Sequence, residues 1–201
     1  MKQIPLLLFI TLFLLSACST TTFDSKEELW EYLKTEEHGY LQNKTVNGVS
    51  FSLVYKPTDL IVDQMLGDDR NTATIDSLRQ HFDRYLYFNL SMSKNEQELL
   101  SNVAGNKQRF GAMVNELAFG MHSKIHMITP AKDTIAMTDY IYPRMYGMSG
   151  ATTLLLVYPK EKNIMESQEI NLTIEDLGFY TGEVKFKIPT DIIKNEPKLK
   201  F

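Results

Sequence analysis

The chain of 201 residues has the length of one large domain or two small ones, and its composition is globular: 43% hydrophobic, 23% charged and 11% aromatic. Its formal net charge of −4 offers no excess of Lys and Arg for a phosphate backbone, so we expect no nucleic-acid partner. The single Cys excludes an internal disulfide, a cysteine-based zinc site and a CxxC redox pair.

The first residues have the features of an export signal. Lys2 precedes an apolar run from Ile4 to Leu15, and these roughly 12 residues are too few for a bilayer span, which needs about 20. The run ends in Leu15-Ser16-Ala17-Cys18, which resembles the lipobox of bacterial lipoproteins: an aliphatic residue and two small residues before a Cys. We therefore interpret residues 1–17 as a lipoprotein signal peptide. An ordinary secretory signal with a chance Cys is the alternative.

The resemblance implies a lipid anchor. Cleavage after residue 17 would leave Cys18 at the new N-terminus, with a diacylglyceryl group on its thiol and a further acyl chain, such as palmitate, on its amine. Two or more acyl chains hold a protein durably on a membrane. Ser19, in place of Asp, implies delivery to the bacterial outer membrane. We expect residues 18–23 to be the lipidated Cys and a short tether, and residues 24–201 to be a single domain.

A helix is predicted at the start of that domain. Asp24 or Ser25 can cap it, Glu27 or Glu28 can complete a capping box, and Gly39 can end it. Its apolar face would consist of Leu29, Trp30 and Leu33.

Alternation of apolar and polar residues then replaces the helical period. Asn47-Gly48 is typical of a two-residue hairpin, because a type I′ turn needs a positive φ at both positions. In the strand that follows, Lys56 is expected on the solvent face, and Pro57 ends the hydrogen-bond ladder. The buried face would consist of Val49, Phe51, Leu53 and Tyr55.

The rest of the chain is predicted to contain further strands. Short helices around 60–66 and 75–82 flank a polar loop at 67–74, and the apolar run 152–158 suits a strand buried on both faces. Alternating apolar residues predict strands near 86–92, 119–127, 135–142, 170–174 and 184–188. Seven to nine strands indicate a mainly β fold: a single antiparallel two-layer sandwich, loosely immunoglobulin-like, with an N-terminal helix and short helical insertions.

Motifs for catalysis or metal binding are weak. His122 and His126 are flanked by methionines, yet a strand would point the imidazoles and thioethers to opposite faces, and Lys124 would repel a cation.

Gly147-Met148-Ser149-Gly150 is close to a nucleophile elbow. The triad order of that fold requires a His after the Ser, but no His follows position 126. We assign no catalytic residue, no metal site and no cofactor.

The most informative segment lies between 140 and 150. Pro143, Gly147 and Gly150 favour bends, and the side chains between them are of the kinds enriched at protein interfaces. The candidate binding patch comprises Tyr142, Arg144, Met145, Tyr146 and Met148.

These features predict a membrane-anchored lipoprotein with a non-catalytic binding, adhesion or assembly role at the bacterial envelope. Its partners would be the lipid bilayer, through acylated Cys18, and another envelope protein or surface ligand. The alternatives are an envelope hydrolase with dispersed acidic residues and a metal-handling protein that uses His122 and His126.

Overall fold

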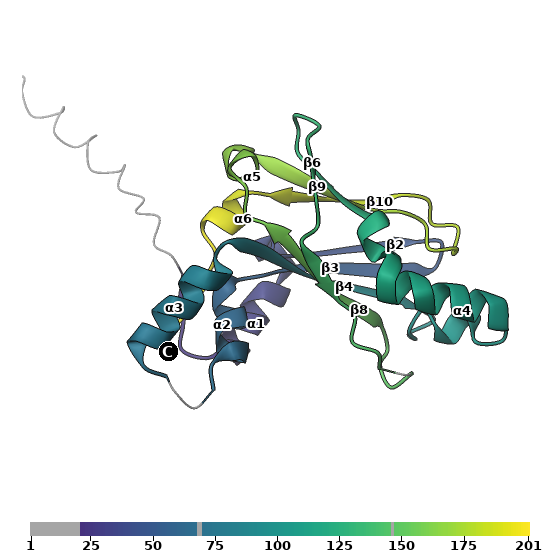
Figure 1. The fold of residues 1–201 in the computed structure, drawn as a ribbon, viewed down its shortest axis with the longest axis horizontal. Helices are drawn as coiled ribbons and strands as arrows, with labels where there is room; N and C mark the ends of the chain where they lie inside the picture. The colour runs from purple at the N-terminus through teal and green to yellow at the C-terminus, as the bar shows by residue number, and fades with distance from the viewer. Residues whose placement is uncertain (1–20, 68–69, 146) are drawn as a thin grey trace, which may run out of the picture.

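The structure is a computed structural model that describes residues 21–67, 70–145 and 147–201 (Figure 1). Residues 1–17, which were predicted to be a signal peptide, lie outside the described residues, as do Cys18 and Tyr146. The fold is β-rich with several antiparallel sheets, as expected, but helix accounts for about 34% of it against 33% for strand. None of the helices in the described part of the chain is long and apolar enough to cross a membrane.

The larger sheet has five antiparallel strands in the order β2-β3-β4-β8-β7. Their bounds are Leu41–Val46 (β2), Val49–Lys56 (β3), Tyr85–Lys94 (β4), Thr152–Pro159 (β8) and Asp139–Ile141 (β7). Asn47 and Gly48, between β2 and β3, have φ values of 48° and 72°, which confirms the predicted hairpin turn.

Two expectations for this sheet are wrong. Lys56 is buried rather than exposed; its ammonium group donates to Gln64 Oε1 at 2.8 Å, and burial lowers its pKa to about 8. The strand β8 is buried on one face only, because Leu155 and Val157 are half-buried on the other. The continuous apolar run did not distinguish a fully covered strand from a partly covered one.

The smaller sheet has four antiparallel strands in the order β10-β9-β5-β6. Their bounds are Val184–Pro189 (β10), Glu169–Ile174 (β9), Ile125–Ile128 (β5) and Thr134–Ile135 (β6). The alternating sets predicted near 170–174 and 184–188 are confirmed: Leu172 pairs with Phe186, and both are fully buried.

The helices are more extensive than the sequence indicated. Their bounds are Lys26–Lys34 (α1), Glu36–His38 (η1), Thr58–Met65 (α2), Thr72–Phe82 (α3), Ser101–Val103 (η2), Lys107–Asn115 (α4), Glu116–Gly120 (η3), Met121–Ser123 (η4), Lys162–Glu166 (α5) and Asp191–Lys194 (α6). Ser25 caps α1 by accepting from Glu28 N, as predicted. The loop expected at 67–74 is shorter, because Asn71 caps α3 and begins it at Thr72.

The strand predicted over 119–127 is the largest error. Only Ile125–Ile128 is a strand; the preceding segment is helical through α4, η3 and η4, and Phe119 is 68% exposed. Buried side chains recur every four residues at Met113, Leu117 and Met121, which is a helical spacing. The apolar residues of 119–127 alternate with polar ones over this short window, and that alternation hid the four-residue period of the buried side chains.

One hydrophobic cluster contains buried residues of both sheets, including Leu90 and Leu156 of the larger and Leu172 and Phe186 of the smaller. The sheets also meet along one edge. Gln42 of β2 donates to the carbonyl oxygen of Lys187 in β10, and the Lys44 ammonium group lies 5.6 Å from the centre of the Phe186 ring. The two sheets therefore share one hydrophobic core.

A buried carboxylate joins the helices to the end of the chain. Asp59 of α2, 4% exposed, accepts two hydrogen bonds of 2.7 Å from the Arg79 guanidinium of α3. It also accepts from the backbone N–H of Leu199 at 2.8 Å, and Arg79 donates to the Leu199 carbonyl oxygen. These bonds hold the last strand, β11 (Lys198–Leu199), against α2 and α3.

The strand β11 in turn holds the start of the described chain. It pairs in parallel with β1 (Thr22–Phe23); Lys198 N donates to Thr21 O and Lys200 N donates to Phe23 O. Figure 1 shows the C-terminus beside α3. The tether expected over residues 18–23 is therefore shorter, because Thr22 and Phe23 belong to the folded domain.

The replacement Asp59→Asn should lower the free energy of unfolding by about 3 kcal/mol, because it breaks a buried ion pair and weakens the bond to Leu199 N. Asp83→Asn is the matched control: the Asp83 side chain that pairs with Lys160 is 58% exposed, and the loss of this pair should cost less than about 1 kcal/mol. Urea unfolding of both variants measures the difference. Equal losses would contradict the role given to Asp59.

Candidate functional site

The loop predicted as a binding patch presents apolar side chains to solvent. Met148 is 80% exposed and Met145 is 40% exposed, and Arg144 is also exposed. Tyr142 differs from its neighbours because it is half-buried and packs against the core. Tyr146 lies outside the described residues.

A buried carboxylate fixes this loop. Glu98 is 2% exposed, and its Oε1 accepts from the backbone N–H groups of Gly147 at 3.1 Å and Ser149 at 3.2 Å. Gly147 has a φ of 81°, the left-handed region that glycine enters without strain. The Ser149 hydroxyl donates to Ala151 O at 2.9 Å, so it completes a turn and is not held by a base as a nucleophile would be. Sequence reasoning missed Glu98, which is far from the loop along the chain.

The two histidines do not share a face. His122 is exposed in η4, whereas His126 lies on β5, so their predicted placement on one strand is wrong. His126 Nε2 lies 2.9 Å from Glu175 Oε1, and Lys124 donates to the other oxygen at 3.0 Å. These hydrogen bonds hold the pKa of Glu175 below its usual value. Across residues 21–67, 70–145 and 147–201, no three His, Cys, Asp or Glu side chains are grouped to hold a metal ion.

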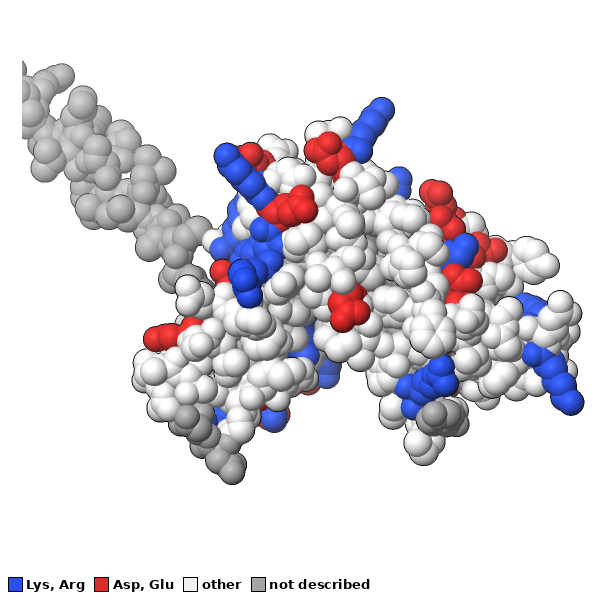
Figure 2. Space-filling model, in the orientation of Figure 1, with Lys and Arg blue, Asp and Glu red and all other residues white. Residues whose placement is uncertain are grey.

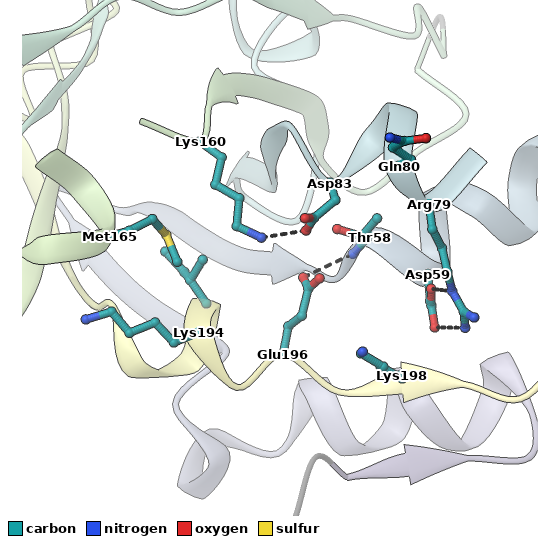
Figure 3. A pocket seen from close by; sticks show the side chains of 11 residues that line it. Thr58, Asp59, Arg79, Gln80, Asp83, Lys160, Met165, Lys194, Glu196 and Lys198 are labelled. Atoms are coloured by element: carbon teal, nitrogen blue, oxygen red, sulfur yellow. Dashed lines mark hydrogen bonds and ion pairs between the residues drawn. The ribbon is translucent and has the colours of Figure 1, made fainter. Parts of the chain in front are cut away.

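A polar pocket of about 350 Å³ lies where α2, α3, α5, α6 and β11 come together (Figure 3). It is built from segments that are far apart in the sequence, and charged side chains dominate its wall. The lining residues are Thr58, Asp59, Arg79, Gln80, Asp83, Lys160, Met165, Ile193, Lys194, Glu196 and Lys198.

Glu196 is a carboxyl group in this pocket with a raised pKa. Its Oε2 accepts from the Tyr55 hydroxyl at 2.7 Å and from Thr58 N at 3.2 Å. Burial raises the pKa of Glu196 above its usual 4.5, although both hydrogen bonds act in the opposite direction. Burial and the neighbouring Glu196 carboxyl also raise the pKa of the Tyr55 phenol. The loss of hydration is therefore the dominant effect on this carboxyl group.

The other two pocket carboxylates already have cationic partners. Asp59 binds Arg79, and Asp83 Oδ1 accepts from Lys160 Nζ at 2.6 Å, as Figure 3 shows. Glycoside hydrolysis generally needs two carboxyl groups that act together on one bond. This pocket offers one carboxyl group outside an ion pair, so its geometry favours the binding of a polar group over acid–base chemistry.

Sequence reasoning named none of these pocket residues. Most of them are common surface residue types, and together they span positions from Thr58 to Lys198. The dispersed acidic residues were foreseen only as a general possibility. Local patterns cannot identify a site assembled from a helix start, a helix end and the last strand.

A second hollow, of about 500 Å³, lies between α4 and the loop after β9. Asp176 shapes this loop by accepting from the backbone N–H groups of Gly178, Phe179, Tyr180 and Thr181. Tyr180 is 87% exposed with a φ of 60°, an unusual conformation for an aromatic residue. The wall of this hollow is largely apolar; its charged side chains are those of Arg109, Glu116, Lys124 and Asp176, and Lys124 is paired with Glu175.

Comparison with known proteins gives little. No known protein family and no curated protein matches the chain. One similar solved structure is that of a novel protein of unknown function from Burkholderia pseudomallei K96243, which is 10% identical. The match covers 83% of this chain and 88% of that one, with a TM-score of 0.41, and we draw no conclusion from it.

The stability contribution of Glu196 should depend on pH. Because its folded pKa is raised, the folded protein keeps a proton that the unfolded chain loses at lower pH. The free energy of unfolding should therefore fall as the pH rises from 4.5 through the folded pKa. The variant Glu196→Gln keeps an oxygen acceptor for Tyr55 and Thr58 and lacks this titration.

Urea unfolding of the wild type and Glu196→Gln between about pH 4 and about pH 7 measures this effect. The stability of the wild type relative to the variant should decrease steadily over that range. A relative stability that increases with pH would mean that the folded pKa is lowered, and it would contradict the assignment.

Proposed function

We propose that this protein is a bacterial lipoprotein, held in the cell envelope by an acylated Cys18, and that its domain binds another envelope component without catalysis. The lipobox supports the anchor, and delivery to the outer membrane is part of the proposal because Ser19 follows the Cys. We also propose that the two antiparallel sheets are layers of a loosely immunoglobulin-like β-sandwich. The shared hydrophobic cluster and the bond from Gln42 to β10 support that arrangement.

The observation that carries the binding role is the anchored loop of Tyr142 to Met148. Exposed methionines adapt to irregular surfaces, and apolar exposure on a held loop is typical of a recognition site. The two backbone hydrogen bonds to Glu98 already restrict the conformations of the loop before a partner binds. A partner would therefore pay less conformational entropy than it would on a flexible loop.

The alternatives have less support. A hydrolase would use Glu196 as its proton donor, yet Asp59 and Asp83 are each engaged by a cation. A metal-handling role would need His122 and His126 together, and they lie on different elements.

The anchor has a direct test. Intact-mass analysis of the native protein, extracted from bacterial membranes in detergent, should give a chain that begins at Cys18 and carries the mass of a diacylglyceryl group and a further acyl chain. The replacement Cys18→Ser should abolish this addition and release the protein from the membrane. An intact leader or an unmodified Cys18 in the native protein would contradict the proposed anchor and localisation.

The recognition loop is tested by replacing exposed side chains that support no core. The double variant Arg144→Ala with Met148→Ala should lose its cross-linked envelope partner by more than about tenfold, since interface anchors of this kind contribute a few kcal/mol. The matched control is Lys185→Ala with Met65→Ala, which removes an exposed cation and an exposed methionine elsewhere. Equal recovery of the partner by both variants would exclude the loop.

A further inference from the structure

Four side chains of the polar pocket gather around one space, as Figure 3 shows, and we call them the polar centre: Thr58, Asp83, Lys160 and Glu196. Thr58 begins α2, Asp83 follows α3, Lys160 follows β8, and Glu196 lies shortly before β11. The positive charge of Lys160 acts to lower the pKa of Glu196, so the two groups are close. Lys194 points away from the polar centre in Figure 3. Tertiary packing therefore brings these four groups together from distant parts of the chain.

Two buried atoms of the polar centre have hydrogen-bonding capacity that the protein leaves unused. Thr58 is 4% exposed, and its hydroxyl oxygen has no hydrogen-bond partner among the described residues. That hydroxyl lies close enough to the Glu196 carboxyl to act on its pKa. The hydrogen bonds from the Tyr55 hydroxyl and from Thr58 N both reach Glu196 Oε2, which leaves Oε1 to accept from another group. Because buried polar groups are nearly always hydrogen-bonded, these atoms call for a partner from outside the chain.

The charges around these atoms alternate in sign. Since the Lys160 ammonium group lies 2.6 Å from Asp83 Oδ1, an ionic ligand would be attracted by one of the two groups and repelled by the other. The surface of the neighbouring α5 and α6 has the same mixture, because Figure 2 shows Lys and Arg side chains lying among Asp and Glu side chains there. The polar centre therefore offers no net attraction to a ligand of either sign, and it favours an uncharged one.

A hydroxyl group matches the unused capacity of the polar centre. It donates one hydrogen bond and accepts two, so it can donate to Glu196 Oε1 and accept from Lys160, which has two donors besides the one that Asp83 receives. Met165 and Ile193 supply apolar surface on the same wall, against which the carbon atoms of a ligand can pack. The volume of about 350 Å³ lies within the range of small-molecule sites. A compact ligand with several hydroxyl groups satisfies all of these features.

We propose that the polar pocket binds an uncharged saccharide, whose hydroxyl groups contact Thr58, Lys160 and Glu196. This site goes beyond the proposed function, because it is separate from the loop of Tyr142 to Met148 and does not depend on the lipid anchor. It gives the domain a small-molecule ligand in addition to a protein partner.

The charge of the ligand is tested with matched hexoses. Glucose, galactose and mannose are uncharged, their amino sugars carry an ammonium group at neutral pH, and their uronic acids carry a carboxylate. Saturation-transfer NMR measures the binding of each to the full native chain, purified in a detergent that has no sugar headgroup. At least one uncharged hexose should bind saturably, and its two charged forms should bind about tenfold more weakly or worse.

Two results of this experiment would overturn the proposal. One is the lack of saturable binding by all of the uncharged hexoses. The other is a charged form that binds more tightly than its uncharged parent, which would mean that the charges of the polar centre select an ion.

The variant Thr58→Val removes the buried hydroxyl and keeps the shape of the side chain. Hexose binding should weaken by about tenfold, because the ligand loses a hydrogen bond in a buried site. The melting temperature should not fall, since this hydroxyl has no partner among the residues that the structure describes. Thr173→Val is the matched control: Thr173 is also buried with an unpartnered hydroxyl, but it lies on β9 outside the pocket. Equal hexose binding by the two variants would exclude this site.

A second pair of variants keeps the test independent of the fold around Thr58. Lys160→Met removes the ammonium donors of the polar centre, and Lys187→Met removes a lysine whose ion pair with Glu169 lies elsewhere. Hexose binding should weaken by about tenfold in the first variant and stay unchanged in the second. An unchanged affinity in Lys160→Met would contradict the contact. Because the probes are soluble sugars, these outcomes do not depend on whether Cys18 carries lipid, which mass analysis tests separately.

Discussion

The Asp59 carboxylate is the interaction on which this arrangement depends. A carboxylate at 4% exposure has lost most of its hydration, which costs several kcal/mol unless the protein replaces those bonds. Asp59 receives two bonds from Arg79 and one from Leu199 N. These bonds fix α2, α3 and β11 relative to one another, and through β11 they also fix β1. The start of the domain, its end and the wall of the polar pocket are therefore determined together.

A second buried carboxylate has the corresponding role at the other end of the larger sheet. Glu98 holds the loop of Tyr142 to Met148 through two backbone N–H groups, as Asp59 holds β11 through one. In both places a desolvated acid accepts hydrogen bonds from backbone N–H groups and so orders a segment that lies outside the two larger sheets. The exposed methionines are therefore held in place even though they contribute nothing to the core.

The sequence predicts the parts of this fold that depend on local pattern. The Asn47-Gly48 turn, the Ser25 cap and the strands around Leu172 and Phe186 follow from turn chemistry and from the period of apolar residues. The helical segment before Ile125 was missed because its buried residues, four apart, interleave with exposed ones that mimic alternation. The ion pairs of the pocket could not be foreseen, because Arg79 is 120 residues from Leu199 and only tertiary packing joins them.

The strand β8 relates the two candidate sites to each other. The recognition loop precedes its first residue, Thr152, and Lys160 of the pocket follows its last residue, Pro159. Eight residues of extended strand separate the sites by about 25 Å. If Cys18 carries lipid, the pocket lies near the bilayer because β11 pairs with β1, and the loop of Tyr142 to Met148 lies at the opposite end of β8, where a protein partner can bind away from the membrane surface.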